Sequence, residues 1–279
     1  MHSHMKLFQH NISSAQPPLA IVTTSWDDDA ASGLEVAELL VAKGLPATFY
    51  VPTGRLGESS LLSGSNLRTL SAAGFEIGAH TVSHRILTSL QGSELTREVA
   101  DCKPRLEDIL GREVSTFCYP KGRFNANVVN EVKRAGYRGA RSAQMLCSAA
   151  VADAYKMPTT MQAYPHHRAN YVKNLVRLRA FPALVRSLPD LIDFEGWLQL
   201  GKRMFDRVLR EGGVWHLFGH PWEIAKLNLW SDLREMLDYV SRREGVTYAT
   251  NAQLLQPGNT TQEVNPEGVA VRHQHTVAH

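Results

Sequence analysis

The sequence predicts an α/β protein with a parallel sheet, built either as a barrel or as an open sheet with helices on both faces. Short apolar, β-branched runs alternate with segments that carry apolar residues at helical spacing, and several of these segments end at a glycine. This alternation is typical of βαβ units, in which a helix connects two parallel strands. At 279 residues, the chain is long enough for one large barrel or two small domains.

The first unit begins with a strand that ends in acidic residues. Residues 20–25 form an apolar, β-branched run, and a tryptophan and three aspartates follow at positions 26–29. Residues 33–43 are predicted to form a helix with Gly44 as its C-cap, and residues 47–51 form the next strand. The aspartates are therefore expected at the carboxyl end of a buried strand.

The later units repeat this pattern. We expect helices over residues 65–73, 94–110, 127–135, 194–210 and 229–243, and strands over residues 75–79, 115–119, 139–142, 213–219 and 246–250. Between about residues 148 and 190 the periodicity weakens and prolines cluster with basic residues, which is typical of a lid or binding loop. We expect one domain over residues 17–255, an N-terminal extension or cloning remnant over 1–16, and a polar tail over 256–279.

Composition fits a globular enzyme and argues against several other classes. The net charge is only +3 and the basic residues are scattered, so nucleic acid is not an expected partner. One basic segment, residues 171–186, is either a solvated helix face or a contact for an anionic part of a substrate. Cys102, Cys118 and Cys147 share no CxxC spacing, which fits a reducing compartment. Without a signal sequence or an apolar run of about 18 residues, a cytoplasmic protein without stable membrane insertion is expected.

Two histidines and a cluster of aspartates are candidate metal ligands. His80 and His84 are four residues apart just after a predicted strand, so both can face one ion. By itself this spacing is a weak signal, because histidines in loops often only form hydrogen bonds. Asp27, Asp28 and Asp29 either cap a helix or bind a cation, and a cation would relieve the repulsion between three adjacent acids.

Four segments together resemble the polysaccharide deacetylase family, also known as the NodB-homology family or carbohydrate esterase family 4. These segments are Ser25-Trp-Asp-Asp-Asp29, Ala47-Thr-Phe-Tyr-Val51, His80-Thr-Val-Ser-His84 and Phe117-Cys-Tyr-Pro-Lys-Gly122. The resemblance covers residues 20–142 well and continues more loosely to His220. It implies a distorted (β/α) barrel of the NodB-homology type, with the active site at the C-terminal rim of the strands, and a cytoplasmic-type member of the family.

The resemblance implies how the residues around the metal divide their roles. Asp27 acts as the catalytic base, and Asp28, His80 and His84 hold one divalent ion. Two imidazoles and a carboxylate accommodate zinc, cobalt, nickel or manganese, and zinc is taken as the expected ion. Three protein ligands leave open positions for water and for the acyl carbonyl, which the ion polarises.

Lys121 and His220 are predicted to complete the catalytic set. By the resemblance, the main-chain N–H of Lys121, in the turn that follows Pro120, stabilises the oxyanion. His220 protonates the departing amine. His216 lies four residues earlier in the same predicted strand and either orients His220 or packs in the core.

The sequence departs from the family pattern around the catalytic base. Asp29 replaces the usual glycine, and Cys118 stands where many members carry an arginine that orients the base. Arg141 either supplies the missing guanidinium to Asp27 or contacts a carboxylate or phosphate of the substrate. The residues expected to contact substrate are Trp26, Tyr119, Pro120 and Trp222, although the two tryptophans are equally suited to the core.

The expected activity is metal-dependent hydrolysis of an acetyl or formyl amide on an amino sugar or glycan precursor, including a carrier-linked sugar, in surface polysaccharide biosynthesis. The missing export signal favours such a substrate over an extracellular polymer. One alternative is hydrolysis of a non-sugar amide or cyclic imide on the same scaffold. The other is a catalytically silent metal-binding protein. The sequence leaves the acyl group, the metal and the oligomeric state open.

Overall fold

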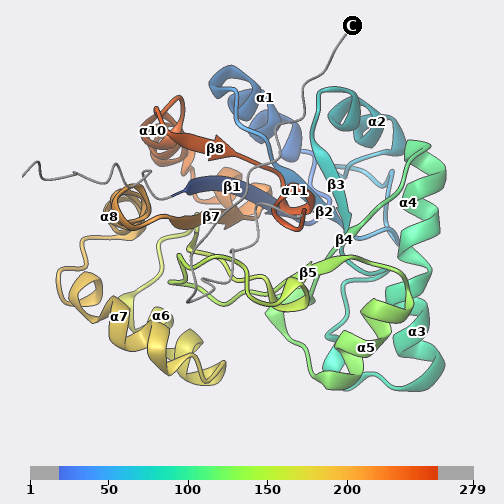
Figure 1. Ribbon diagram of the computed structural model, residues 1–279. Coiled ribbons are helices and arrows are strands. Elements are labelled where there is room, and N and C mark those ends of the chain that lie inside the picture. Colours follow the sequence, from blue (N-terminus) through green and yellow to red (C-terminus); the bar gives the residue numbers. More distant parts are fainter. Residues whose placement is uncertain (1–18, 257–279) are drawn as a thin grey trace, which may run out of the picture.

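A curved sheet of parallel strands forms the centre of the molecule (Figure 1). The computed structural model describes residues 19–256. Within them, the strand order is β5-β4-β3-β2-β1-β7-β6, and β8 pairs with β1. The strands are β1 Ala20–Asp27, β2 Thr48–Val51, β3 Glu76–Ala79, β4 Thr116–Cys118, β5 Gly139–Arg141, β6 Met161–Gln162, β7 Gly213–Gly219 and β8 Val246–Tyr248. Because all these pairs are parallel, the carboxyl ends of the strands meet at one rim.

Helices surround the outside of this sheet (Figure 1). They are α1 Gly33–Lys43, α2 Gly64–Ala72, α3 Gly92–Ala100, α4 Cys102–Leu110, α5 Ala126–Arg134, α6 Arg168–Arg177, α7 Phe181–Ile192, α8 Trp197–Glu211, α9 Pro221–Lys226, α10 Trp230–Val240 and α11 Asn251–Leu254. The arrangement confirms the α/β fold predicted from the sequence, a distorted (β/α) barrel. Each helix within residues 19–256 falls short of the length or apolar character needed to cross a bilayer.

β1 is the central strand, and all its residues are buried. On one side, residues 20–22 pair with β8 and residues 25–27 pair with β2, so these two strands diverge along the same edge. Asn251 fills the gap between them. Its side chain accepts a hydrogen bond from Thr23 (3.0 Å) and donates one to the Tyr50 hydroxyl (2.9 Å). The end of β1, which carries Asp27, is thereby held between β2 and β7.

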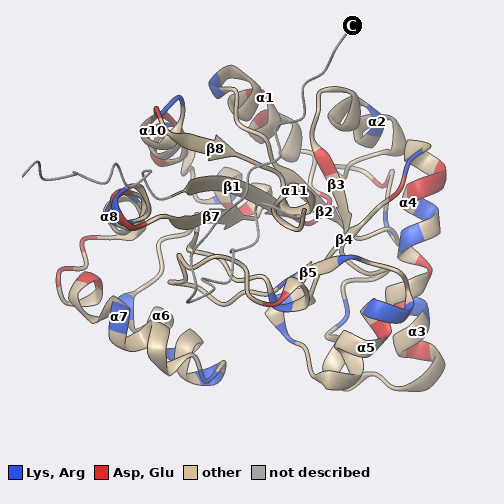
Figure 2. Ribbon diagram, in the orientation of Figure 1, with Lys and Arg blue, Asp and Glu red and all other residues tan. Residues whose placement is uncertain are grey.

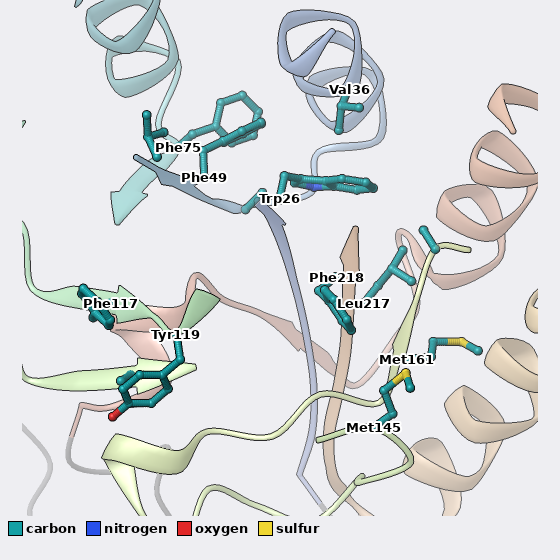
Figure 3. Close-up of a cluster of buried hydrophobic side chains, with 14 of the residues drawn as sticks. Trp26, Val36, Phe49, Phe75, Phe117, Tyr119, Met145, Met161, Leu217 and Phe218 are labelled. Atoms are coloured by element: carbon teal, nitrogen blue, oxygen red, sulfur yellow. The ribbon is translucent and has the colours of Figure 1, made fainter. Parts of the chain in front are cut away.

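Trp26 belongs to the core between the sheet and the helices. Its ring lies beneath α1 beside Val36, and neighbouring Phe49 packs on Phe75 with 5.3 Å between ring centroids (Figure 3). Because side chains alternate along a strand, Trp26 and Asp27 point to opposite faces of the sheet. Trp26 is 0% exposed, so the prediction that it contacts substrate is wrong.

Two segments differ from the predicted elements. The helix expected over residues 94–110 is two helices, α3 and α4, which meet at Asp101. Pro104 explains the break, because proline lacks an N–H and its ring crowds the carbonyl four residues earlier. The segment expected to be irregular, residues 148–190, contains β6, α6 and most of α7. The prolines of this segment favoured an irregular structure in the sequence analysis, but Pro182 occupies the first turn of α7, where proline is tolerated.

The predicted N-terminal extension, residues 1–16, lies outside the described residues. The predicted polar tail also lies outside them, apart from Gln256.

Candidate metal centre and active site

The carboxyl ends of the strands surround a cavity of about 650 Å³. The predicted site residues that line it are Asp27, Asp28, His80, His84, Tyr119, Lys121, Arg141, His220 and Trp222. The structure therefore brings together side chains that lie up to almost 200 positions apart in the sequence. Pro120 is buried below the turn that it begins and does not line the cavity, so its predicted contact with substrate is not supported.

Asp28, His80 and His84 direct one carboxylate oxygen and two imidazole nitrogens towards a common point. These donor atoms lie within 4.8 Å of one another. Oδ1 of Asp28 is 3.5 Å from Nε2 of His84 and 3.9 Å from Nε2 of His80. Donors about 2.0–2.2 Å from zinc lie roughly 3.4 Å apart in a tetrahedron. The donor set therefore fits an ion of this size after small side-chain movements.

The backbone turns sharply at both ligand-bearing loops. Asp28 and His84 adopt left-handed φ angles of 77° and 57°. The Asp28 N–H donates to the Tyr50 carbonyl (3.0 Å), and the His84 N–H donates to the Thr81 hydroxyl (2.9 Å). Such φ angles are unfavourable for residues other than glycine and are concentrated at functional sites.

Hydrogen bonds fix which donor atoms face the proposed ion. His80 donates its Nδ1–H to the Cys118 carbonyl at 2.7 Å, which leaves the lone pair of Nε2 directed towards Asp28. Burial lowers the pKa of His80 to about 4, so this imidazole is neutral near pH 7. Trp222 donates its indole N–H to Oδ2 of Asp28 at 2.8 Å and leaves Oδ1 for the ion.

Asp27, His80 and Cys118 form a second group with ligand spacing, but a guanidinium already occupies this position. Arg141 donates to Asp27 and to the sulfur of Cys118, which is 2.9 Å from its NH2. Burial also raises the pKa of the Cys118 thiol, which keeps it protonated. A metal cation beside this guanidinium would be repelled, so Asp28 with the two histidines is the better candidate.

Asp27 and Arg141 form a buried ion pair at the rim of the barrel. The guanidinium carbon lies 4.7 Å from the ring centroid of Phe218 and 5.4 Å from that of Tyr50. Burial alone would raise the pKa of Asp27, but the charge of Arg141 holds it below its ordinary value. The ion pair uses Oδ2 of Asp27. Its Oδ1 is buried without a hydrogen-bond partner in the described residues and is thus a free acceptor.

His220 lies on the other side of Asp27, with its Nε2 4.0 Å from Oδ2 of that carboxylate. Its Nδ1–H donates to Glu223 at 2.7 Å, and Gln162 donates to the same Glu223 oxygen at 2.8 Å. Burial opposes protonation of His220, but Glu223 and Asp27 together raise its pKa above the ordinary value. His220 can therefore hold a proton on Nε2, the atom that faces the cavity.

Glu223 and Gln162 are site residues that the sequence analysis missed. Glu223 is three residues after His220, and this short spacing is a signal that could have found it. Gln162 comes from β6 in a segment with no comparable signal. His216 accepts from Ser25 at 2.8 Å and donates to the Pro158 carbonyl, so it packs inside the barrel.

The turn after β4 brings a main-chain segment into the cavity. Lys121 has a left-handed φ of 55° inside the 3-10 turn Pro120–Gly122. The next residue has a φ of 61°, and a Cβ on this Gly122 would lie 2.4 Å from the Cβ of Ala143. Only glycine fits there, so Gly122 permits the turn. Tyr119 borders the cavity but is only 1% exposed, because its ring packs against Phe124 with 4.9 Å between ring centroids and its hydroxyl donates to the Tyr155 carbonyl (3.0 Å). Its predicted contact with substrate is therefore not supported.

Comparison with known proteins identifies relatives of this chain. Residues 16–140 match the family described as polysaccharide deacetylase. Chitin deacetylase from Pestalotiopsis sp is 28% identical over 126 residues, which are 45% of this chain and 42% of that protein. YxkH from Bacillus subtilis (strain 168) is 23% identical over 124 residues, 44% of each chain. The chain thus spans less than half the length of these two curated relatives.

A solved structure extends the similarity of fold beyond the matched segment. It is a Mycobacterium smegmatis protein assigned to the polysaccharide deacetylases, with a TM-score of 0.61 at 16% identity, and the overlap covers 87% of this chain and 91% of that one. The residues matched to the family include Asp27, Asp28, His80, His84 and Lys121. Residues 16–140 are therefore similar in sequence to the polysaccharide deacetylase family, and the likeness over the rest of the chain is one of fold.

Proposed function

We propose that this protein hydrolyses the N-acyl amide of an amino sugar, with one divalent ion held by Asp28, His80 and His84. The proposal depends above all on one juxtaposition: the carboxylate of Asp27, with a free oxygen, lies within 4.8 Å of a nitrogen of His80. Two imidazoles and a carboxylate favour zinc, and cobalt, nickel or manganese suit the same donors.

Four residues divide the proton transfers and the stabilisation of charge. The ion, when bound, supplies a Lewis acid that polarises the acyl carbonyl and acidifies water. Asp27 takes a proton from the attacking water, and Arg141 keeps Asp27 ionised beforehand. The main-chain N–H of Lys121 donates to the developing oxyanion. Nε2–H of His220 then protonates the amine nitrogen as the C–N bond breaks, giving a carboxylic acid and a free amine.

The substrate we propose is an N-acetyl or N-formyl amino sugar, either free or part of a glycan precursor for surface polysaccharide. The name of the Pestalotiopsis relative, chitin deacetylase, supports an acetylated amino sugar. A cavity of about 650 Å³ is of the size that takes small ligands. Trp222, which is 41% exposed, offers a ring face for a pyranose. We further propose that residues 17–255 form one deacetylase domain, in which α6 and α7 cover the substrate.

Release of acetate or formate tests this function. Zinc-loaded protein is incubated with N-acetyl and N-formyl amino sugars and, in parallel, with simple amides and cyclic imides. We expect acid release from the sugars, and Asp27→Asn should abolish it while the metal stays bound. Hydrolysis of cyclic imides without hydrolysis of any amino sugar would show that the protein is an imide hydrolase and contradict the proposed sugar substrate. No turnover of any substrate by metal-loaded protein would favour the catalytically silent alternative.

A further inference from the structure

α6 closes one end of the catalytic cavity. Asn170, Lys173, Asn174 and Arg177 follow the helical spacing of one face, and all four line the cavity. Asn174 anchors this face. Its side chain accepts from the Met145 N–H at 3.0 Å and donates to the Ala143 carbonyl at 2.8 Å. The position of Lys173 and Arg177 at the cavity is thus fixed by a buried side chain between them.

This end of the cavity carries positive charges without acidic partners. Lys121, Lys173 and Arg177 line the main cavity, and Arg123 joins Arg177 in the wall of an adjoining cavity of about 260 Å³. Burial, followed by the nearby charge of Arg123, lowers the pKa of Arg177. Among the ion pairs of residues 19–256, none involves these four side chains.

The acidic groups of the cavity lie with the proposed metal site instead. Asp27 and Asp28 belong to the end of β1, and Glu223 is bonded to His220. The cavity therefore has an acidic, metal-binding part and a basic part formed by α6 and the turn after β4. Gathering like charges around one space is unfavourable unless an anion enters it.

We propose that Lys173 and Arg177 bind a phosphate group of the substrate while its N-acyl group reaches Asp28 and the histidines. This inference rests on the proposed function and narrows its substrate to a phosphorylated amino sugar. Arg177 can donate two hydrogen bonds to phosphate oxygens, and Lys173 adds a mobile charge. The phosphate belongs either to a soluble sugar phosphate or to a lipid carrier, since the same chemistry recognises both.

Steady-state kinetics with matched substrates tests the phosphate subsite. The substrates are an N-acetyl amino sugar, its 1-phosphate, the same phosphate on a short polyprenyl chain, and an N-acetyl sugar carboxylate. We expect a lower KM for the phosphates. Lys173→Gln with Arg177→Gln should raise that KM by about 10-fold or more and leave the neutral sugar unchanged. Arg210→Gln, an exposed arginine of α8 that does not line the cavity, is the control.

Binding of a phosphate monoester, measured by calorimetry, separates the possible failures. Hydrolysis of neutral and phosphorylated sugars with equal KM would overturn the subsite and leave the proposed function intact. A preference for the carboxylate would overturn the choice of phosphate. Phosphate binding that survives loss of Lys173 and Arg177 but disappears in Asp28→Ala would locate the anion at the metal, against this proposal. If no sugar is hydrolysed, loss of phosphate binding in the double variant still tests the site.

The outer face of α6 and α7 exposes large apolar side chains. Six large apolar side chains on these helices are 37–71% exposed, out of ten such exposed side chains within residues 19–256; the six are Val172, Val176, Phe181, Val185, Leu188 and Ile192. The four on α7 recur at spacings of four, three and four residues, so they lie along one stripe. Val172, Leu188 and Ile192 line a common groove of about 420 Å³.

The segment that carries these helices has a net positive charge. Residues 168–192 contain five Lys or Arg residues and one acid, Asp190, which pairs with Arg207, and Arg168 lines the apolar groove itself. Figure 2 shows basic positions along both α6 and α7. An apolar stripe flanked by positive charge is typical of helices that lie on an anionic lipid surface. We infer that the α6–α7 face docks on an anionic membrane, which charge complementarity favours over a second copy of this basic face.

Sedimentation with vesicles tests the membrane surface. Wild-type protein should sediment with vesicles of phosphatidylcholine and phosphatidylglycerol but not with phosphatidylcholine alone, and salt should weaken binding. Val185→Asp with Leu188→Asp should abolish sedimentation, whereas Val41→Asp, at a valine on α1 that is 59% exposed against 66% for Val185, should not change it. Failure of the wild type to bind would overturn the inference. If the wild type is a dimer and the double variant is a monomer, the face binds a second copy of this chain instead of a membrane.

Discussion

Cys118 and Arg141 are direct register partners on the neighbouring strands β4 and β5, and Arg141 reaches past the sulfur of Cys118 to pair with Asp27. By the resemblance to the polysaccharide deacetylases, Cys118 stands where many members carry the arginine that orients the base. Because parallel strands end at the same rim, one strand can supply a guanidinium that its neighbour lacks. The two side chains of the ion pair are 1% and 6% exposed.

An arginine placed at position 118 on β4 should compensate for the loss of Arg141 on β5. Arg141→Ala alone leaves the Asp27 charge buried without a partner, which we expect to cost about 3–5 kcal/mol of unfolding free energy and most of kcat/KM. Adding Cys118→Arg should restore part of both, since the new guanidinium enters the vacated space. Denaturant unfolding and kinetics measure the two quantities. A double variant no better than Arg141→Ala would show that the position on β5 matters in itself.

Glu223 should set the alkaline limit of activity. His220 must be protonated to act as the acid, and its pKa is raised because Glu223 and Asp27 outweigh burial. Activity should therefore fall as pH rises through this raised pKa. Glu223→Gln removes one of the negative charges, so the alkaline limb of kcat/KM should move to lower pH. Lys226→Gln on the same helix is the control, and an unmoved limb in Glu223→Gln would contradict the role of Glu223.

Substitution of Gly122 should lower stability and kcat much more than substitution of Lys121. Gly122→Ala places a Cβ 2.4 Å from Ala143 at a φ of 61°, so we expect a loss of about 2–4 kcal/mol of unfolding free energy and of kcat. Lys121→Gly keeps the main-chain N–H and relieves its left-handed φ, so kcat on a neutral sugar should change little. A severe loss of kcat in Lys121→Gly would assign the catalytic role to its side chain.

His216 should make the fold sensitive to acid. Burial lowers the pKa of His216 to about 3, whereas the unfolded chain binds this proton near pH 6.5. Its contribution to stability is therefore complete above about pH 6.5 and falls as the pH drops towards 3, by about 1.4 kcal/mol per pH unit. His216→Leu, whatever its stability at pH 7, should show a shallower decline between pH 6 and 4 in urea unfolding. An unchanged slope would contradict this.

The sequence predicts most of the barrel because its signals are local. Alternating strands and helices with glycine caps locate β1, α1 and β2 to within a residue or two. The errors have identifiable physical causes. Pro104 divides one predicted helix, and α7 forms although it carries Pro182 in its first turn and Pro189 inside the helix.

The metal ligands could be identified from sequence, but the residues around them only in part. Asp28, His80 and His84 are chemically distinctive and follow strands that end at one rim. Trp26 could have been excluded, since it precedes Asp27 by one residue in a strand and must face the other way. Gln162 reaches the cavity only through the tertiary placement of β6, for which the sequence offers no local signal, whereas the basic composition of residues 171–186 did indicate the segment that contains Lys173.

The divalent metal content of the purified protein tests whether Asp28, His80 and His84 form a metal site. Elemental analysis of wild type, His80→Ala and Asp27→Asn after zinc loading and desalting measures zinc per chain. We expect about one zinc per chain in wild type and Asp27→Asn, and loss of that zinc in His80→Ala, because the two remaining ligands bind too weakly. Undiminished zinc in His80→Ala would contradict the metal site built from Asp28, His80 and His84.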